Sequence, residues 1–165
     1  MLNKNMISII AAIGKNRELG KDNKLLWHIS EDMKRFKNLT TGNVVIMGRK
    51  TYDSIPEKFR PLPNRVNIVV TRDSNYQQKG AIVCHSIEDS LEKAREFNKE
   101  IFIIGGASIY EQGIKFADKL YLTLVDKEYS DADAFFPDYS EFKKVISEEN
   151  HSSGEFQFKF IEIEK

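Results

Sequence analysis

Short apolar runs alternate along the chain with segments whose apolar residues recur at helical spacing. The runs are rich in β-branched residues, which is typical of buried strands. They lie at residues 7–13, 44–47, 66–70, 81–83, 101–104 and 119–125. Between several of them, residues 30–39, 87–97 and 108–116 show the helical pattern. In the middle segment Ile87, Leu91 and Ala94 share one face, which predicts an amphipathic helix.

This alternation predicts an α/β fold. Runs that are apolar at successive positions indicate strands buried on both faces, as in parallel sheets. The C-terminal tail differs, because Phe156, Phe158 and Phe160 alternate with polar residues and predict a strand with one wetter face. We therefore expect a three-layer sandwich around a mostly parallel central β-sheet with an antiparallel C-terminal strand. In such sheets ligands bind at the carboxyl ends of the strands.

Composition narrows the possible partners. A chain of 165 residues predicts a single domain, 1–165, with its core starting near residue 6. Lys plus Arg and Asp plus Glu number 25 each, so no net field favours nucleic acid or an anionic membrane. We expect a monomer that binds a small-molecule substrate, and any anionic ligand needs a local basic cluster.

The remaining composition signals favour a cytoplasmic protein without a metal. The apolar stretch 6–13 is far shorter than the ~20 residues of a membrane span and suits a buried strand. A single cysteine, Cys84, permits no internal disulfide and fits a reducing compartment. The three histidines are scattered without metal-ligand spacing, so no metal site is predicted.

A first candidate site is the segment Gly48-Arg49-Lys50-Thr51. It is not a P-loop, because five residues separate Gly42 from Gly48 and Arg49 interrupts the Gly-Lys step. A strand ending at Gly48 with a helix starting at Arg49 would direct backbone N–H groups and two cations at one anion. The alternative is a solvated basic turn.

Two more strand ends could hold a ligand. Gly105-Gly106 follows the run 101–104, where glycine permits close approach of a ligand or of another backbone segment. The alternative is a tight turn, and the chain has no G-x-G-x-x-G dinucleotide fingerprint. Thr71-Arg72 follows the run 66–70, where arginine suits bidentate phosphate binding, although a surface arginine is the commoner case.

Asp32 is the most informative single residue. Ser30 is a plausible N-cap, and helical spacing then places Asp32 beside Met33 and on the face of Phe36. A carboxylate at the edge of an apolar stripe must be paired, protonated, or available for a ligand's N–H donors, because an unpaired buried charge is costly. The alternative is a first-turn aspartate favoured by the helix dipole.

Together these segments resemble the dihydrofolate reductase family over nearly the whole chain. Order and spacing across about 130 residues, rather than any single motif, carry the resemblance. The matching pieces are MISIIAA at 6–12, NRELG at 16–20, Trp27, Asp32, Phe36, Thr40, VIMGRKT at 45–51, SIPEKFRPLPNR at 54–65, Asn67, Thr71-Arg72, Ile104-Gly105-Gly106, Tyr110, LYLT at 120–123 and Phe136-Pro137.

The resemblance implies that NADPH reduces 7,8-dihydrofolate to tetrahydrofolate, with hydride passing to pterin C6 and a proton to N5. Asp32, with Trp27 and Thr123 as the other catalytic residues, would accept hydrogen bonds from the pterin 2-amino group and a ring nitrogen. Water could deliver the proton while Asp32 acts only electrostatically. Arg65 would bind the α-carboxylate of the glutamate tail. The other substrate-binding positions would be Ile10, Ala11, Met33, Phe36, Ile55, Leu62, Ile104 and Tyr110.

The resemblance also assigns a cofactor site. Gly48, Arg49, Lys50 and Thr51 would bind phosphates, and Thr71 with Arg72 would bind the 2′-phosphate that distinguishes NADPH from NADH. The segment 14–27 would be a mobile loop that closes over the nicotinamide. The remaining cofactor positions would be Ala12, Leu19, Gly20, Gly105, Gly106, Ala107, Ser108 and Ile109, with a cis peptide between Gly105 and Gly106.

Three positions depart from the family pattern, and two rival functions remain open. Leu26 replaces the usual proline before Trp27, Ala134 replaces a threonine, and Ser108 stands where some members carry an arginine. One rival is a relative of the same fold, such as the pyrimidine reductase of riboflavin synthesis, which is expected to lack the pairing of Trp27 with Asp32. The other is a protein that binds NADPH or folate without turnover.

Overall fold

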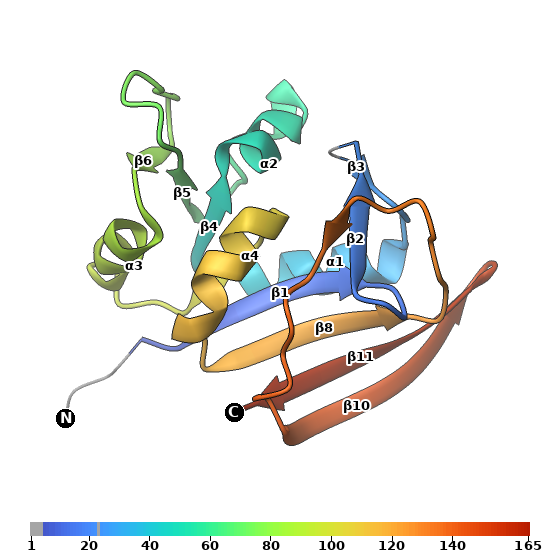
Figure 1. Ribbon diagram of the computed structural model, residues 1–165. Helices are drawn as coiled ribbons and strands as arrows, with labels where there is room; N and C mark the ends of the chain where they lie inside the picture. Colours follow the sequence, from blue (N-terminus) through green and yellow to red (C-terminus); the bar gives the residue numbers. More distant parts are fainter. Residues whose placement is uncertain (1–4, 23) are drawn as a thin grey trace.

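The chain is built around one eight-stranded sheet, shown in Figure 1. The computed structural model describes residues 5–22 and 24–165. In spatial order the strands are β10 (Lys144–Ser153), β11 (Phe156–Glu164), β8 (Lys119–Val125), β1 (Ile7–Ile13), β7 (Ile101–Ile103), β4 (Val44–Gly48), β5 (Val66–Val70) and β6 (Ile82–Cys84). The six from β8 to β6 are mutually parallel, and β11 is antiparallel to β8. The predicted fold class is confirmed.

Helices cover both faces of this sheet, and alternate residues of each strand contact opposite layers. The helices are α1 (Ser30–Thr40), α2 (Arg49–Ser54), α3 (Ile87–Arg95) and α4 (Ala107–Gly113), with short 3-10 turns η1 (Glu57–Phe59) and η2 (Ile114–Phe116). Ile9 of β1 packs in the cluster that contains α3 and α4, whereas Ile10 packs with residues of α1 and α2. In Figure 1, α4 lies in front of the sheet and α1, drawn fainter, lies behind it.

Strand β10 was not predicted from the sequence. Its residues are exposed except Ser153, which is partly buried, so they show no apolar periodicity. The strand forms because it pairs along its length with β11, whose Phe158 and Phe160 are buried. Backbone hydrogen bonds to a well-anchored neighbour therefore hold this polar edge strand in place.

A second, three-stranded sheet lies beside the large one and also escaped the sequence analysis. Its order is β3 (Lys24–Leu25), β2 (Glu18–Lys21), β9 (Ala134–Phe135), all antiparallel. Part of the predicted loop 14–27 is therefore strand. Asn23 of that loop lies outside the described residues.

The helix boundaries need three corrections. Ser30 is the first helical residue and not the N-cap, a position taken by Ile29 without a side-chain cap. The helix expected at 87–97 ends at Arg95, and the one expected at 108–116 is α4 followed by η2. Within the described residues no helix is long and apolar enough to cross a membrane.

Candidate active site

The centre of the candidate site is a hydrogen bond between α1 and β8. The hydroxyl of Thr123 donates to Asp32 Oδ1 at 2.5 Å. Burial raises the pKa of the Asp32 carboxyl, and the Thr123 hydroxyl and the Arg35 charge oppose this rise. The structure thus brings together two predicted residues that are 91 positions apart in the sequence.

Two aromatic side chains predicted for this site are also buried. The Tyr110 hydroxyl lies 2.8 Å from the carbonyl oxygen of Ile10 and 2.9 Å from that of Ile104, joining α4 to the middle of β1 and to the residue that follows β7. Its pKa is raised by burial and by the nearby Asp32 charge. Trp27 is 4% exposed and its indole N–H is buried without a hydrogen-bond partner among the described residues. Buried N–H groups are normally hydrogen-bonded, so this indole N–H is available to donate to a ligand or a water molecule.

Five of the apolar residues predicted to line the substrate site lie together. Ile10, Phe36, Ile55, Leu62 and Ile104 belong to one cluster on the face of α1 and α2.

Two other predicted apolar residues lie elsewhere. Ala11, as the neighbour of Ile10 along β1, packs in the cluster on the opposite face. Met33 stays a predicted substrate-binding residue, and it is 55% exposed rather than part of a buried apolar stripe. The reason is that α1 buries only Thr40 fully and leaves Met33 outside the core.

Arg65 lies beside the C-terminal end of α1. Its Nη1 donates to Thr40 Oγ1 at 3.1 Å and its Nε to the Pro63 carbonyl at 2.9 Å, while the guanidinium lies 5.9 Å from the Phe36 ring centroid. Partial burial lowers the pKa of Arg65. These contacts fix the side chain next to the apolar cluster.

The two glycine-containing strand ends lie against each other. The Gly48 amide donates to the Gly105 carbonyl at 2.8 Å, and the Gly105-Gly106 peptide is cis, as the resemblance implied. A Cβ at Gly106 would lie 3.3 Å from Thr51 Oγ1, and one at Gly48 would lie 3.1 Å from Ile109. Side chains larger than hydrogen would therefore crowd the junction between α2 and α4.

The basic residues of the predicted phosphate site are exposed. Arg49 contacts the carboxylates of Asp53 and Asp73, at 3.5 and 3.3 Å, and its guanidinium lies 5.0 Å from the Tyr76 ring centroid. Sequence reasoning missed all three partners, although the i, i+4 spacing of Arg49 and Asp53 was a usable signal. The other exposed members are Lys50, Arg72 and Ser108, with Thr51, Thr71 and Ala107 partly buried.

The segment that follows β1 is tied to β9 and to the chain after β8. Glu18, 1% exposed, accepts the Asn16 amide at 2.7 Å and the Tyr129 amide at 2.8 Å. The Asp22 amide donates to Asp133 at 3.0 Å. Sequence reasoning missed Glu18, although a carboxylate directly before the apolar Leu19 was a signal. The predicted cofactor residues Leu19 and Gly20 are buried in the same segment, and Ala12 is partly buried at the end of β1.

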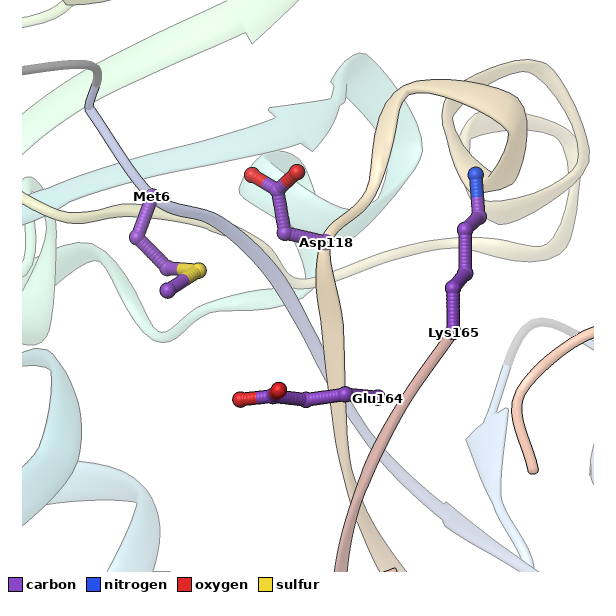
Figure 2. A pocket seen from close by; sticks show the side chains of 4 residues that line it. All are labelled: Met6, Asp118, Glu164 and Lys165. Atoms are coloured by element: carbon purple, nitrogen blue, oxygen red, sulfur yellow. The ribbon is translucent and has the colours of Figure 1, made fainter. Parts of the chain in front are cut away.

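A separate shallow pocket lies at the opposite end of β1 and β8. Met6, Asp118, Glu164 and Lys165 line it, as Figure 2 shows. The Asp118 carboxylate accepts the Ile7 amide at 2.9 Å, which gives this side chain a structural role. None of the predicted site residues lines this pocket. Across residues 5–22 and 24–165 no group of three or more potential ligands could hold a metal ion.

Comparison with known proteins decides the family. A family model described as "Dihydrofolate reductase" matches residues 6–165. The chain belongs to the dihydrofolate reductase family. A Bacillus subtilis dihydrofolate reductase is 41% identical over 97% of this chain and 95% of its own length. A type 3 dihydrofolate reductase from Salmonella typhimurium is 42% identical over 81% of this chain and 80% of its own.

A solved structure places the fold in the same family. The dihydrofolate reductase from Enterococcus faecalis, complexed with NADP(H) and RAB-propyl, superposes with a TM-score of 0.85 and 30% identity. The match covers 96% of this chain and 95% of that one. The family assignment counts against the rival reductase of riboflavin synthesis.

Proposed function

We propose that this chain carries out the reaction of its family at the residues gathered around Asp32 and Thr123. The chain is an NADPH-dependent oxidoreductase that reduces 7,8-dihydrofolate to 5,6,7,8-tetrahydrofolate. When bound, NADPH supplies the hydride that pterin C6 receives, and a proton is added at N5. What the chain itself contributes is binding, orientation and a suitable charge.

The carboxylate of Asp32 is the observation that carries the proposal. It lies at the end of the large sheet where β1 and β8 end, and one of its oxygens accepts from Thr123. The other can accept from the pterin 2-amino group and ring nitrogen, because an ionised carboxylate accepts several hydrogen bonds. Holding a negative charge beside the pterin favours a proton on N5, and water can deliver that proton.

The surrounding side chains fit a flat heteroaromatic ligand with an acidic tail. Ile10, Phe36, Ile55 and Ile104 offer an apolar surface beside the carboxylate. The Trp27 N–H, which has no hydrogen-bond partner in the described part of the chain, offers a donor for a ligand oxygen or a bound water. Arg65, at the end of α1, would bind the α-carboxylate of the tail.

The paired strand ends fit the cofactor. Gly48 and Gly105 are in close contact and have no side chains. A dinucleotide could therefore approach the backbone closely at this junction. Arg49, Lys50 and Thr51 would hold the phosphates, and Thr71 with Arg72 the 2′-phosphate. Arg49 would then exchange its contacts with Asp53 and Asp73 for phosphate oxygens.

The remaining assignments are also part of the proposal. Residues 1–165 would form a single domain, because one sheet connects elements from both ends of the chain. Balanced charge and the absence of a membrane-spanning helix among the described residues suit a cytoplasmic protein. We propose a monomer, since the residue pairs Asp32–Thr123 and Gly48–Gly105 of the two half-sites meet within a single copy of the chain.

Turnover of the Asp32→Asn variant tests this function. Oxidation of NADPH with dihydrofolate should be measurable for the parent and should fall about 100-fold or more in Asp32→Asn at neutral pH. Glu88→Gln, which removes an exposed carboxylate on α3, serves as the control and should keep parental rates. No turnover in the parent would favour a binding protein without catalysis. Parental turnover in Asp32→Asn would reject the role of Asp32 alone.

A further inference from the structure

Arg35 lies one helical turn beyond Asp32 and packs against the same part of the sheet. Its guanidinium carbon lies 4.5 Å from the ring centroid of Phe160 and 5.6 Å from that of Tyr121. Its Nη1 donates to the Leu122 carbonyl at 3.4 Å. Arg35 is thus held between α1 and the strands β8 and β11.

The strand register places this cation near the carboxylate. Leu122, whose carbonyl Arg35 contacts, directly precedes Thr123, which hydrogen-bonds Asp32. Phe160, whose ring lies under Arg35, is paired with Thr123 across the two strands. Asp32 and Arg35 therefore face adjacent positions on one surface of the sheet, as i, i+3 neighbours on a helix do.

Arg35 differs from the other cations of α1. Lys34 and Lys37 are exposed, whereas Arg35 is partly buried. Between the described residues no direct ion pair links Arg35 to a carboxylate within 4.0 Å. Because Arg35 is partly buried, water screens its charge less than the charge of an exposed residue. The Arg35 charge can therefore act on Asp32 without a direct ion pair.

Several other charged or titratable groups face this pair. They are Tyr110 from α4, Tyr121 from β8, Glu149 from β10 and Glu162 from β11. The Lys119 Nζ lies 3.2 Å from Glu162 Oε2, so the lysine offsets the charge of Glu162. Glu149 is exposed on the edge strand β10. Burial lowers the pKa of Arg35, and the nearby Asp32 charge opposes that change. Arg35 is the cation among these groups that acts on Asp32.

We propose that Arg35 is a positioning residue for the reaction, whose charge keeps Asp32 ionised so that it can accept the N–H donors of the pterin. The proposal rests on the role given to Asp32 above. It assigns no contact between Arg35 and substrate. Arg35 sets the pH range over which the anchor carries its charge.

The titration of Asp32 in the ligand-free protein tests this directly. The carboxyl carbon of Asp32 is followed by NMR in protein labelled at aspartate, and Asp32→Asn assigns its signal. In Arg35→Met the midpoint should rise by about half to one pH unit, as expected for loss of a nearby, partly screened charge. Lys34→Met removes an exposed cation from the same helix and should shift the midpoint by less than about 0.2 unit.

Two further variants separate charge from packing. Arg35→Gln keeps an N–H donor for Leu122 but loses the charge, so its midpoint should rise as in Arg35→Met. Arg35→Lys keeps the charge and should restore most of the parental midpoint. The midpoint of kcat/KM against pH should move with the Asp32 midpoint in each variant.

Different results would overturn the two proposals separately. An unchanged Asp32 midpoint in folded Arg35→Gln or Arg35→Met would leave Arg35 a purely structural residue and overturn this inference. Full turnover of Asp32→Asn would instead reject the anchor itself. The NMR titration needs no turnover and would still report what Arg35 does to Asp32.

Discussion

Asp32 carries a conflict between stability and binding at the scale of one side chain. Burial disfavours its ionised form, and yet a pterin with two N–H donors needs that form as acceptor. The Thr123 hydroxyl from β8 and the Arg35 charge from α1 counteract this effect of burial. The residue is therefore maintained by its neighbours in a state that packing alone would not favour.

Replacing Thr123 by valine should weaken this support without creating a cavity. The Thr123 hydroxyl donates to the ionised carboxylate, so its removal raises the pKa of Asp32. We expect kcat/KM to fall by roughly 10- to 150-fold, since a hydrogen bond to a charged group contributes about 1.5–3 kcal/mol. The pH midpoint of kcat/KM should move upward. A variant with the parental rate and midpoint would show that the hydroxyl is dispensable.

The same conflict predicts that Asp32→Asn stabilises the fold. Because the folded-state pKa of Asp32 is above its ordinary value of 3.8, the parent loses stability as pH rises through that folded pKa. Asparagine does not titrate, so Asp32→Asn should melt higher than the parent at pH 8, with the difference smallest near pH 4. Melting temperatures at both pH values check this. A variant less stable than the parent at pH 8 would contradict the sign.

At the scale of elements, the segment between β1 and α1 is held by buried polar contacts rather than by apolar packing alone. Glu18 joins this segment to Tyr129, which also packs on Trp27 at 5.4 Å between ring centroids. Burial would raise the pKa of Glu18, but the backbone N–H groups of Tyr129 and Asn16 outweigh it and lower the pKa. The expected mobility of the segment remains a prediction, and this contact opposes it.

Glu18→Ala should release the segment. It leaves the backbone N–H groups of Asn16 and Tyr129 without their acceptor, so the free energy of unfolding should fall by about 1–3 kcal/mol in urea titrations. Since the pKa of Glu18 is lowered from 4.5, its contribution is present above that pH and is lost as pH falls through the folded value. The control Glu128→Ala removes an exposed carboxylate nearby and should change stability little. Equal stability of Glu18→Ala and parent would contradict the role.

The sequence predicted the elements whose side chains are buried, and it missed those held by pairing. Strand β7, for example, is apolar throughout, and its run of apolar residues was sufficient to predict it. Strand β10 and the β2–β3–β9 sheet depend on partners distant in the sequence, which a local pattern does not report. In the site, residue types indicated Asp32 and Gly105, but the packing of Arg35 against Phe160 required the register of β8 and β11.

At the scale of the whole molecule, the sheet joins two half-sites. Thr123 belongs to β8 and holds Asp32 of α1 beside it, while Gly48 and Thr71 lie at or just after the ends of β4 and β5. The central strand β7 leads to Gly105, between the two halves. A hydride donor on one side and a pterin on the other would meet at this position, which is why the proposed function requires both halves.

Cofactor discrimination should therefore be measurable as stabilisation of the whole fold. At a concentration 100 times its Kd, NADPH should stabilise the protein by about 2.7 kcal/mol and raise Tm by about 5–10 °C. NADH at the same concentration should raise Tm far less, because it lacks the 2′-phosphate proposed to contact Thr71 and Arg72. Arg72→Ala should narrow the difference between the Tm shifts with NADPH and with NADH, because it removes a proposed contact to the 2′-phosphate. Since Arg72 is exposed, its loss should leave the Tm of the unliganded protein unchanged. Equal shifts with NADPH and NADH in the parent would place the 2′-phosphate elsewhere.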